Sequence, residues 1–364
     1  MSNIVFFIGT TAELIKMYPV MQEMDSRSLA YKVVASGQNV LDDNIIRSSG
    51  IRKVDLFLSS RSIKQSTFGL LIWFLKTFII GFFKMRKEIK VSANDTNIFL
   101  VHGDTISTVM GAALGRILGF DVHHVEAGLR SFNWMKPFPE ELDRVIVSKL
   151  SHVHYCPNDW AAKNLMNRSG VVINTQENTL LDSLNFALRT ASSPNLLQSI
   201  NGKFFIFVLH RQENLFNSEL VTRLIKKIIE ISNSELKCLM IMHSPTKACL
   251  SSLGLIDEIN SCENIVTTAR MNYFEFMKVM DRCEFVVTDG GSNQEECYYF
   301  GKPCLILRTE TERNEGLGYN TVLSELNDAI IDDFLNNINR YKKPPIVTKN
   351  KPSKIIVDFI ENEK

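Results

Sequence analysis

The segment HHVEAGLRSFNWMKPFPEELDR, His123 to Arg144, places acidic residues among aromatic ones. Glu126 follows a run that is typical of a strand. Glu140 and Arg144 are one helical turn apart, so this pair is expected on one face of a helix. If this pair lay on the surface, it would contribute little to stability. Aromatic side chains nearby would exclude water, however, and a low dielectric shifts the pKa of a carboxylic acid toward the range needed for proton transfer. The segment therefore predicts carboxylates that move protons behind a dry wall of aromatic side chains.

A further carboxylate, Asp104, stands in the motif HGDT after another apolar run. One interpretation is that it caps the helix that follows. Thr105 or Ser107 can serve as that cap, which leaves Asp104 to face a binding site. We therefore group Asp104, Glu126 and Glu140 as a candidate acid–base cluster.

The second half of the chain carries a pattern suited to phosphate. In TDGGSNQEE, Gly290, Gly291 and Ser292 stand between an apolar run and a helix that we expect to begin near Asn293. Free backbone N–H groups at a helix N-terminus bind phosphate or diphosphate. The acids that follow, Glu296 among them, are able to accept hydrogen bonds from a ribose diol. An ordinary glycine turn before a helix with acids in its first turn explains the same residues.

Histidines end two other apolar runs of the second half. His210 and Arg211 stand in VLHRQEN, and His243 stands in MHSPT. A His and an Arg that face a site can neutralise or protonate a departing phosphate. A single His at a strand end is also a common hydrogen-bonding residue without a chemical role.

All of these motifs directly follow short apolar or β-branched runs. Such runs alternate with helical patterns, for example 107–118, 219–231 and 273–281, which predicts an α/β fold with parallel sheets covered on both faces. In open α/β sheets, ligands bind beyond the carboxyl ends of the strands. Motifs from both halves therefore predict two Rossmann-like domains whose sheets face a central cleft. We place the boundary near Gly170, between domains 1–170 and 171–350. The predicted strands are NIVFFIG, YKVVAS, NIFLVHGD, DVHHVEAG, HVHYCP, FFIFVLH, KCLMIMHS, NIVTTA, EFVVTDGG and PCLILR.

Composition agrees with two domains. The chain has 364 residues, of which 45% are hydrophobic and 22% charged, with a formal net charge of +1. That length exceeds what one hydrophobic core usually supports, and the charge balance gives no reason to expect nucleic acid as a partner. The 7 cysteines show no metal-binding spacing, which favours a reducing cytosol. The start MSNIVFFIGTTAE lacks the basic region and cleavage site of a signal peptide. We expect a cytoplasmic protein.

The apolar segment FGLLIWFLKTFIIGFFKMRK, Phe68 to Lys87, has uninterrupted apolar runs too short to span a bilayer. We interpret it as a helix packed between a sheet and a partner subunit. A less favoured alternative is peripheral membrane contact through 68–83, with the basic end at the lipid headgroups.

Taken together, the motifs resemble the non-hydrolysing UDP-N-acetylglucosamine 2-epimerases. The family patterns GTRPEAIK, HGDT, HVEAGLR, PWPEExNR, GHRxEN and DSGGxQEE are similar, in this order, to GTTAELIK, HGDT, HVEAGLR, PFPEELDR, LHRQEN and DGGSNQEE. GKPCLILRTETERNE, Gly301 to Glu315, is similar to a further family pattern. Each motif alone is weak, but the ordered set extends from about residue 4 to residue 323 and is highly specific.

The resemblance implies a glycosyltransferase-B-like fold in which the C-terminal helix, 351–364, packs back on the first domain, and it implies a homodimer. It implies conversion of UDP-N-acetylglucosamine to UDP-N-acetylmannosamine by elimination and re-addition of UDP through a glycal, for bacterial surface polysaccharide synthesis, with no metal and no cofactor. The implied acid–base carboxylates are Asp104, Glu126 and Glu140, without an assignment of the first base. His210 would assist the departing diphosphate, with Lys16 and Arg144 as electrostatic support. The implied UDP-sugar contacts are Thr11, His243, Gly290, Gly291, Ser292, Glu296 and Arg313.

Several positions depart from the family patterns. Thr11 replaces an arginine expected near the diphosphate, and Ala12 replaces a proline. SGG becomes Gly290-Gly291-Ser292, and TGNT becomes part of NTQENT. The QHREM-like segment, associated with regulation in bacterial members, is reduced to GQNVLDDN, so we do not transfer an allosteric site. These changes indicate a divergent branch.

Alternatives therefore stay open. The chain could act on another UDP-HexNAc, or release UDP and free sugar as the hydrolysing branch does. It could be a glycosyltransferase of the same fold that docks to a membrane through the 68–83 helix. A nucleotide-sugar-binding protein without activity is the last alternative, and the retained carboxylates argue against it.

Overall fold

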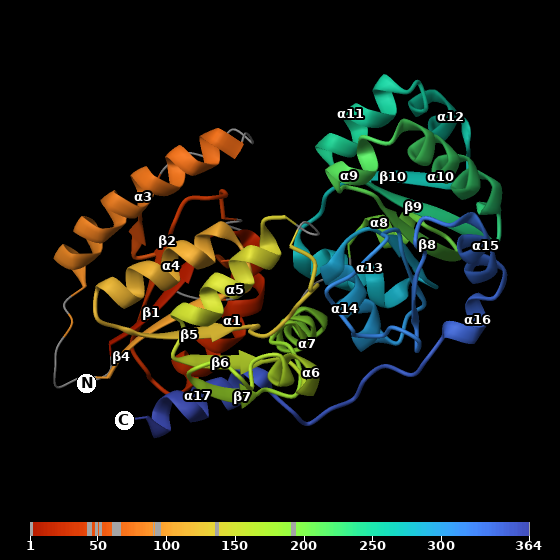
Figure 1. The fold of residues 1–364 in the computed structure, drawn as a ribbon. Helices are drawn as coiled ribbons and strands as arrows, with labels where there is room; N and C mark the ends of the chain where they lie inside the picture. The colour runs from red at the N-terminus through yellow and green to blue at the C-terminus, as the bar shows by residue number, and fades with distance from the viewer. Residues whose placement is uncertain are drawn as a thin grey trace. The chain divides into compact units, whose positions relative to one another are not determined.

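The computed structural model describes residues 3–41, 46–47, 50, 53–59, 67–89, 91, 96–134, 138–190 and 194–363. The chain divides into two compact units (Figure 1). Unit 1 contains Met1–Ser183 and Thr348–Lys364, and unit 2 contains Leu184–Val347. Each is an α/β unit built on its own parallel sheet, as the sequence predicts.

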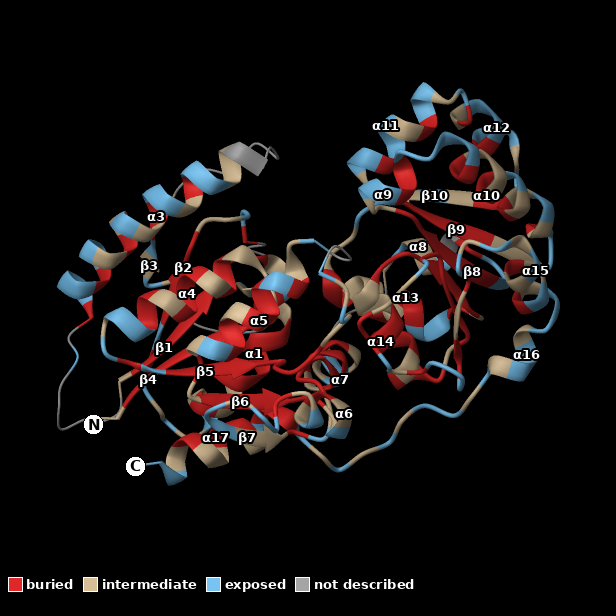
Figure 2. Ribbon diagram, viewed as in Figure 1, coloured by how far each residue is buried: buried red, intermediate tan, exposed pale blue. Residues whose placement is uncertain are grey.

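Unit 1 is built on a 7-stranded sheet in the order β3-β2-β1-β4-β5-β6-β7, and its strands pair in parallel. Its central strands, β1 (Asn3–Ile8) and β4 (Asn97–His102), are apolar runs buried on both faces, which is the pattern of a sheet covered by helices (Figure 2). The strands are β1 (Asn3–Ile8), β2 (Tyr31–Ala35), β3 (Leu56–Phe57), β4 (Asn97–His102), β5 (Asp121–Val125), β6 (Val153–Cys156) and β7 (Val171–Asn174). The helices are α1 (Thr11–Ser26), α3 (Thr67–Glu88), α4 (Ile106–Ile117), α5 (Glu140–Leu150), α6 (Asp159–Lys163), α7 (Leu180–Thr190), which continues into unit 2, and α17 (Pro352–Asn362).

Helix α4 lies close to the first sheet because two of its residues are glycines. A Cβ atom on Gly111 would lie 2.6 Å from the Phe7 ring, and one on Gly115 would lie 2.9 Å from the Phe99 ring. The helix begins with a capping box in which the Thr105 hydroxyl accepts from the Thr108 N–H. Thr105 is therefore the cap, as one interpretation of HGDT proposes, and Asp104 just before it is left for other contacts.

Helix α3 leaves an apolar face exposed. One side packs on the core of unit 1 through Trp73 and its neighbours, and the helix runs along the outside of the unit (Figure 1). The other side is covered by nothing in the described chain, with Phe83 66% exposed. This exposed face consists of Leu71, Ile72, Leu75, Ile79 and Phe83. None of the helices in the described part of the chain is long and apolar enough to cross a membrane.

The C-terminal helix α17 belongs to unit 1 although all of unit 2 precedes it. Arg27, just after α1, contacts Asp358 at 2.7 Å and Glu361 at 2.6 Å. At the start of α17, the Ser353 hydroxyl and N–H both donate to Asp182, at 2.6 and 2.8 Å. These contacts attach α17 to α1 and α7.

The division between the units lies at Ser183, later in the chain than the boundary predicted near Gly170. The difference arises from β7, which pairs with β6 and so extends the first sheet. Its sequence, VVIN, is short and only partly buried, so it lacks the long apolar run by which the predicted strands were recognised.

Unit 2 contains a 6-stranded sheet in the order β10-β9-β8-β11-β12-β13 with parallel pairing. Its core includes the stacked rings of Phe205 and Phe285, whose centroids are 4.7 Å apart. The strands are β8 (Lys203–Val208), β9 (Leu236–Met242), β10 (Ile265–Ala269), β11 (Val286–Thr288), β12 (Cys304–Ile306) and β13 (Thr321–Leu323). The helices are α8 (Leu196–Ser199), α9 (Gln212–Leu215), α10 (Ser218–Ile231), α11 (Ser244–Ser252), α12 (Ile256–Ser261), α13 (Tyr273–Arg282), α14 (Gly291–Phe300), α15 (Asp328–Asn336) and α16 (Ile338–Tyr341).

Candidate active site

In unit 1, the loop after β4 and the first turns of α5 meet through Asp104 and Arg144. Arg144 Nε and Nη2 donate to the same oxygen, Asp104 Oδ2, at 2.9 and 2.6 Å. Arg144 Nη1 donates to Glu141 Oε2 at 3.1 Å. Two predicted residues, Asp104 and Arg144, are thus in direct contact, and charge-assisted bonds of this kind fix the orientation of the carboxylate.

Glu126, at the end of β5, is held by groups from two other segments of unit 1. Lys16 of α1 forms a buried ion pair with Glu126 Oε2, and the Asn178 side-chain amide donates to the same oxygen. His102 Nε2 lies 3.7 Å from it. Glu126 has a φ of +63°, a left-handed conformation that is uncommon outside glycine. Its contact with Lys16 joins two more of the predicted residues.

Glu140, the third predicted carboxylate, begins α5 and is half-buried. Its neighbour Glu141 is fully buried and accepts hydrogen bonds from Arg130 Nε at 2.6 Å and the Ser131 N–H at 2.9 Å. Burial raises the pKa of Glu141, but the hydrogen bonds from Ser131, Arg130 and Arg144 outweigh burial and hold the pKa below its usual value. Glu141 therefore orients Arg144. It was not among the predicted site residues because acids in a helix's first turn are common without a further role.

Glu13 is a second buried acid that was not among the predicted site residues. Its side chain accepts from the Gly9 N–H at 2.7 Å, the Thr105 hydroxyl at 2.8 Å and the Thr10 hydroxyl at 3.2 Å. Burial raises the pKa of Glu13 to about 7 despite these hydrogen bonds. Glu13 thereby ties the loop after β1 to the loop after β4 that carries Asp104. Its only sequence signal was its place in GTTAELIK.

The aromatic residues of the opening segment do not form the predicted wall. Phe132, Trp134 and Phe138 are all exposed. Phe132 packs edge-on against Trp160, and the Arg130 guanidinium lies 4.9 Å from its ring centroid. Glu126 and Lys16 are buried although these rings are exposed, so the prediction of a wall was wrong.

In unit 2, His210 is positioned by a buried aspartate, Asp289, at the end of β11. Asp289 accepts from the His210 N–H at 3.1 Å and the Arg211 N–H at 2.9 Å, and its Oδ1 lies 3.0 Å from His210 Nδ1. Burial raises the pKa of Asp289, but the contacts with His210 and the backbone hydrogen bonds lower it below its usual value overall. The His210 ring stacks on the ring of His243, with centroids 5.1 Å apart. Burial, with His210 and Arg270 nearby, lowers the pKa of His243 to about 4, so this ring is neutral at pH 7.

The N-terminus of α14 lies beside His210. The helix begins at Gly291, with Gly290 as its N-cap, so the start predicted near Asn293 was late and Ser292 belongs to the first turn. A Cβ atom on Gly290 would lie 3.2 Å from His210 Cε1, and one on Gly291 would lie 3.1 Å from Arg313 Nε. His210 and Arg313 thus lie beside the first residues of the helix, and a helix N-terminus is suited to an anion.

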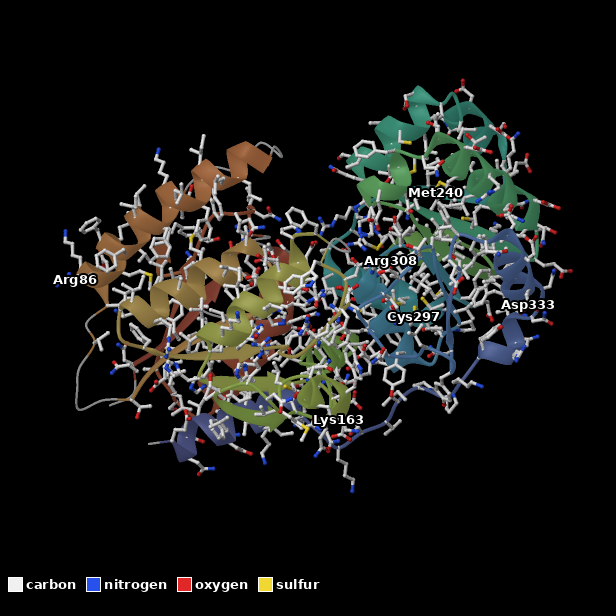
Figure 3. The ribbon with its side chains drawn as sticks, viewed as in Figure 1. Arg86, Lys163, Met240, Cys297, Arg308 and Asp333 are labelled. Atoms are coloured by element: carbon white, nitrogen blue, oxygen red, sulfur yellow. The ribbon has the colours of Figure 1, made fainter. Side chains whose placement is uncertain are left out.

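Side chains of α14 and of the loop after β12 form ion pairs with one another near this N-terminus. Arg313 forms an ion pair with Glu295 at 2.6 Å. Arg308, labelled in Figure 3, pairs with Glu312 at 3.1 Å. Glu296 is buried and accepts from the Asn293 side-chain amide at 2.8 Å.

The remaining predicted residue, Thr11, opens α1 in unit 1, and its hydroxyl lies 3.4 Å from the Val40 carbonyl oxygen. The predicted residues therefore form two sets. Unit 1 contains Lys16, Asp104, Glu126, Glu140, Arg144 and Thr11, and unit 2 contains His210, His243, Gly290, Gly291, Ser292, Glu296 and Arg313. In the described part of both units, no three His, Cys, Asp or Glu side chains are arranged to hold a metal ion.

Comparison with known proteins matches this architecture. A family model described as UDP-N-acetylglucosamine 2-epimerase matches residues 22–351. A UDP-N-acetylglucosamine 2-epimerase of Methanococcus maripaludis is 29% identical, with 100% of each chain covered. A UDP-2,3-diacetamido-2,3-dideoxy-D-glucuronate 2-epimerase of Pseudomonas aeruginosa is 28% identical, with 93% of each chain covered.

Among solved structures, the Methanocaldococcus jannaschii UDP-GlcNAc 2-epimerase in complex with UDP-GlcNAc and UDP superposes with a TM-score of 0.80, at 26% identity and with 99% of each chain covered. The two parallel α/β units are those of a glycosyltransferase-B-like fold. A family match over most of the chain carries more weight than any single motif. The chain belongs to the UDP-N-acetylglucosamine 2-epimerase family, a family of isomerases.

Proposed function

We propose that this protein converts UDP-N-acetylglucosamine to UDP-N-acetylmannosamine without releasing the sugar. Family membership supports a 2-epimerase. The observation that carries the chemistry is Glu126, a buried carboxylate in a left-handed backbone conformation whose side chain is held by Lys16 and Asn178. A buried charge with a fixed orientation is suited to proton transfer, and a protein that only binds nucleotide sugar gains nothing from it.

The unit 2 set is the proposed UDP-binding half. The diphosphate would lie at the N-terminus of α14, which begins at Gly291, and Arg313, held there by its ion pair with Glu295, would face it. His210, oriented by Asp289, would give a proton or positive charge to the departing diphosphate.

The unit 1 set is the proposed proton-transfer half. A carboxylate removes the proton from carbon 2 of the sugar, the C–H electrons form the double bond between carbons 1 and 2, and the bond from carbon 1 to the diphosphate oxygen breaks. A carboxylic acid then returns a proton to carbon 2 on the opposite face, and UDP adds back to carbon 1. Asp104 contacts Arg144 and Glu126 contacts Lys16, so each carboxylate has a fixed orientation and either is a candidate for the first base. Glu140 would complete the set.

Thr11 favours a second candidate within the same family, epimerisation of a different UDP-sugar. A cation expected from the family pattern is absent at this position. The Pseudomonas aeruginosa relative is named for a diacetamido glucuronate substrate, so substrates differ among proteins of similar sequence. Release of free UDP and sugar is the further alternative.

We also propose that the protein is a cytosolic enzyme of surface polysaccharide synthesis. We propose further that it forms a homodimer through the exposed face of α3. A hydrophobic face of this kind is typically covered by a partner. Phe83→Asp should convert the dimer to monomer in analytical ultracentrifugation, whereas Met166→Asp, at another exposed apolar residue, should not. A protein that is monomeric but sediments with anionic vesicles would support peripheral membrane contact instead.

The test of the proposed function is proton NMR of UDP-N-acetylglucosamine with the enzyme in deuterated water. UDP-N-acetylmannosamine carrying deuterium at carbon 2 would support epimerisation and its proton abstraction together. Free UDP with N-acetylmannosamine would indicate the hydrolysing reaction. An unchanged spectrum from protein that binds UDP would favour another UDP-sugar, to be tested first with the diacetamido glucuronate.

A further inference from the structure

Asp143, in the first turn of α5, is a buried carboxyl that the proposed mechanism does not use. Only 5% of its surface is exposed, and its backbone N–H donates to the Pro139 carbonyl oxygen at 3.0 Å. Within the described part of the chain, its Oδ2 is buried and has no hydrogen-bond partner. Because an ionised carboxylate is costly to bury when one of its oxygens accepts no hydrogen bond, the neutral acid is favoured at this position.

The charges around Asp143 act in the same direction. Asp104, from the loop after β4, and Glu140, from the same turn of α5, both oppose its ionisation. Arg144 favours ionisation, but its guanidinium already donates to Asp104 and Glu141. Burial first, and then the two carboxylates, raise the pKa of Asp143 to about 8. At neutral pH its carboxyl therefore keeps its proton.

The sequence gives an independent reason to consider this position. Asp143 stands in PFPEELDR where the similar family pattern, PWPEExNR, has asparagine. A protonated carboxyl and an amide have nearly the same shape, and each offers a donor and an acceptor. The acid, unlike the amide, becomes negatively charged when the pH rises.

We propose that Asp143 is a positioning residue of the reaction, whose protonated carboxyl keeps a further negative charge away from Asp104 and Glu140. This inference rests on the proposed function. When Asp143 ionises, the new negative charge disfavours the ionised form of the neighbouring carboxylates. A carboxylic acid among them then gives its proton back to carbon 2 less readily. The new charge also repels the anionic substrate and the departing diphosphate. Turnover should then fall on the alkaline side, by a change that belongs to Asp143 and not to a group that touches the sugar.

The experiment compares the pH dependence of kcat for the wild-type protein and Asp143→Asn with UDP-N-acetylglucosamine. We expect the wild-type kcat to fall above about pH 8, by up to about tenfold per pH unit. Asp143→Asn should keep its neutral kcat to about pH 9, one unit beyond that fall, with KM at neutral pH unchanged within about twofold. Asp182→Asn is the matched control, because Asp182 is also an aspartate whose pKa burial raises, yet its partner is Ser353 of α17. That variant should keep the alkaline fall.

Urea unfolding at several pH values separates a structural role from the proposed one. If Asp143→Asn removes a pH dependence of stability but keeps the alkaline fall in kcat, Asp143 acts on folding alone and the inference is wrong. Asp143→Ser, which is smaller and cannot ionise, should also lose the fall and serves if the asparagine variant does not fold. If the wild-type protein turns over no UDP-sugar, both proposals fail. A pH-dependent stability that Asp143→Asn removes would then show that the protonated acid is real and the reaction misassigned.

Discussion

Arg144 donates two hydrogen bonds to a single oxygen of Asp104, at 2.9 and 2.6 Å, and leaves the other oxygen of that carboxylate outside the pair. This geometry fixes the orientation of the carboxylate and leaves its second oxygen available to contact a substrate. It also depends on the planar fork of the guanidinium, which a lysine cannot reproduce.

Arg144→Lys should therefore lower kcat by about 10²-fold, because a carboxylate that is no longer fixed loses its alignment with the reacting atom. UDP affinity should stay within about twofold, since the proposed UDP contacts lie in unit 2. Steady-state kinetics and calorimetric titration with UDP measure the two quantities. Arg27→Lys, at the contact with α17, is a control that should leave kcat unchanged. If Arg144→Lys lowered the affinity for UDP as much as it lowered kcat, the assignment of Arg144 to the proton-transfer half would be wrong.

Glu126→Gln should lower kcat by about 10²- to 10⁴-fold, the range for loss of an acid–base group. It should also lower Tm, because Lys16 is left as a buried charge without its carboxylate, a change that costs about 3–5 kcal/mol in other proteins. Combining it with Lys16→Met should restore much of the stability and none of the activity. Thermal unfolding and kinetics of both variants test this. Recovery of turnover in the double variant would exclude Glu126 from the chemistry.

Asp289→Asn should lower both the affinity for UDP and kcat, because it removes the carboxylate that orients His210. The pKa of Asp289 is held below its usual value in the folded protein. Its contribution to stability is therefore present above the ordinary aspartate pKa and is lost as the pH falls through the folded value. Acid unfolding of wild type and Asp289→Asn measures that difference, which should vanish at the acidic end. Equal stability of the two proteins at neutral pH would contradict it.

Glu13→Gln should stabilise the protein at pH 8 relative to wild type. The pKa of Glu13 is raised from 4.5 to about 7, so the folded state binds more protons than the unfolded state between these values. Wild-type stability should then fall as the pH rises through this window, by about 3 kcal/mol in total. The variant should lack that fall. Urea unfolding between about pH 4 and about pH 8 checks this, and an unchanged slope would show that Glu13 is ionised in the folded protein throughout.

The sheets were largely predictable because a parallel strand that is buried on both faces appears in the sequence as a continuous apolar run. Every predicted strand is present, from NIVFFIG to PCLILR, and the motifs after them lie at strand ends. The strands that were missed, β3, β7 and β13, are short and partly exposed. Burial, the property that makes a strand recognisable, is what they lack.

The site was predictable where a residue's role depends on its own strand end, and less so where it depends on a neighbour. Asp104 and Arg144 were both predicted, but Glu141, which orients Arg144, carries no local pattern that separates it from an ordinary helix-start acid. Phe132 and Trp134 failed as a predicted wall because the direction of a side chain in a loop is set by tertiary contacts. The local sequence therefore predicts which residues are buried better than it predicts which side chains contact one another.

The return of α17 to unit 1 has a consequence for how the chain is made. The ribosome releases residues in order, and domains generally begin to fold as they emerge. Unit 1 lacks α17 until all of unit 2, Leu184–Val347, has been synthesised. Arg27 therefore meets Asp358 and Glu361 only at the end of translation. The nascent first unit has to persist throughout that interval with the α17-binding surface of α1 uncovered.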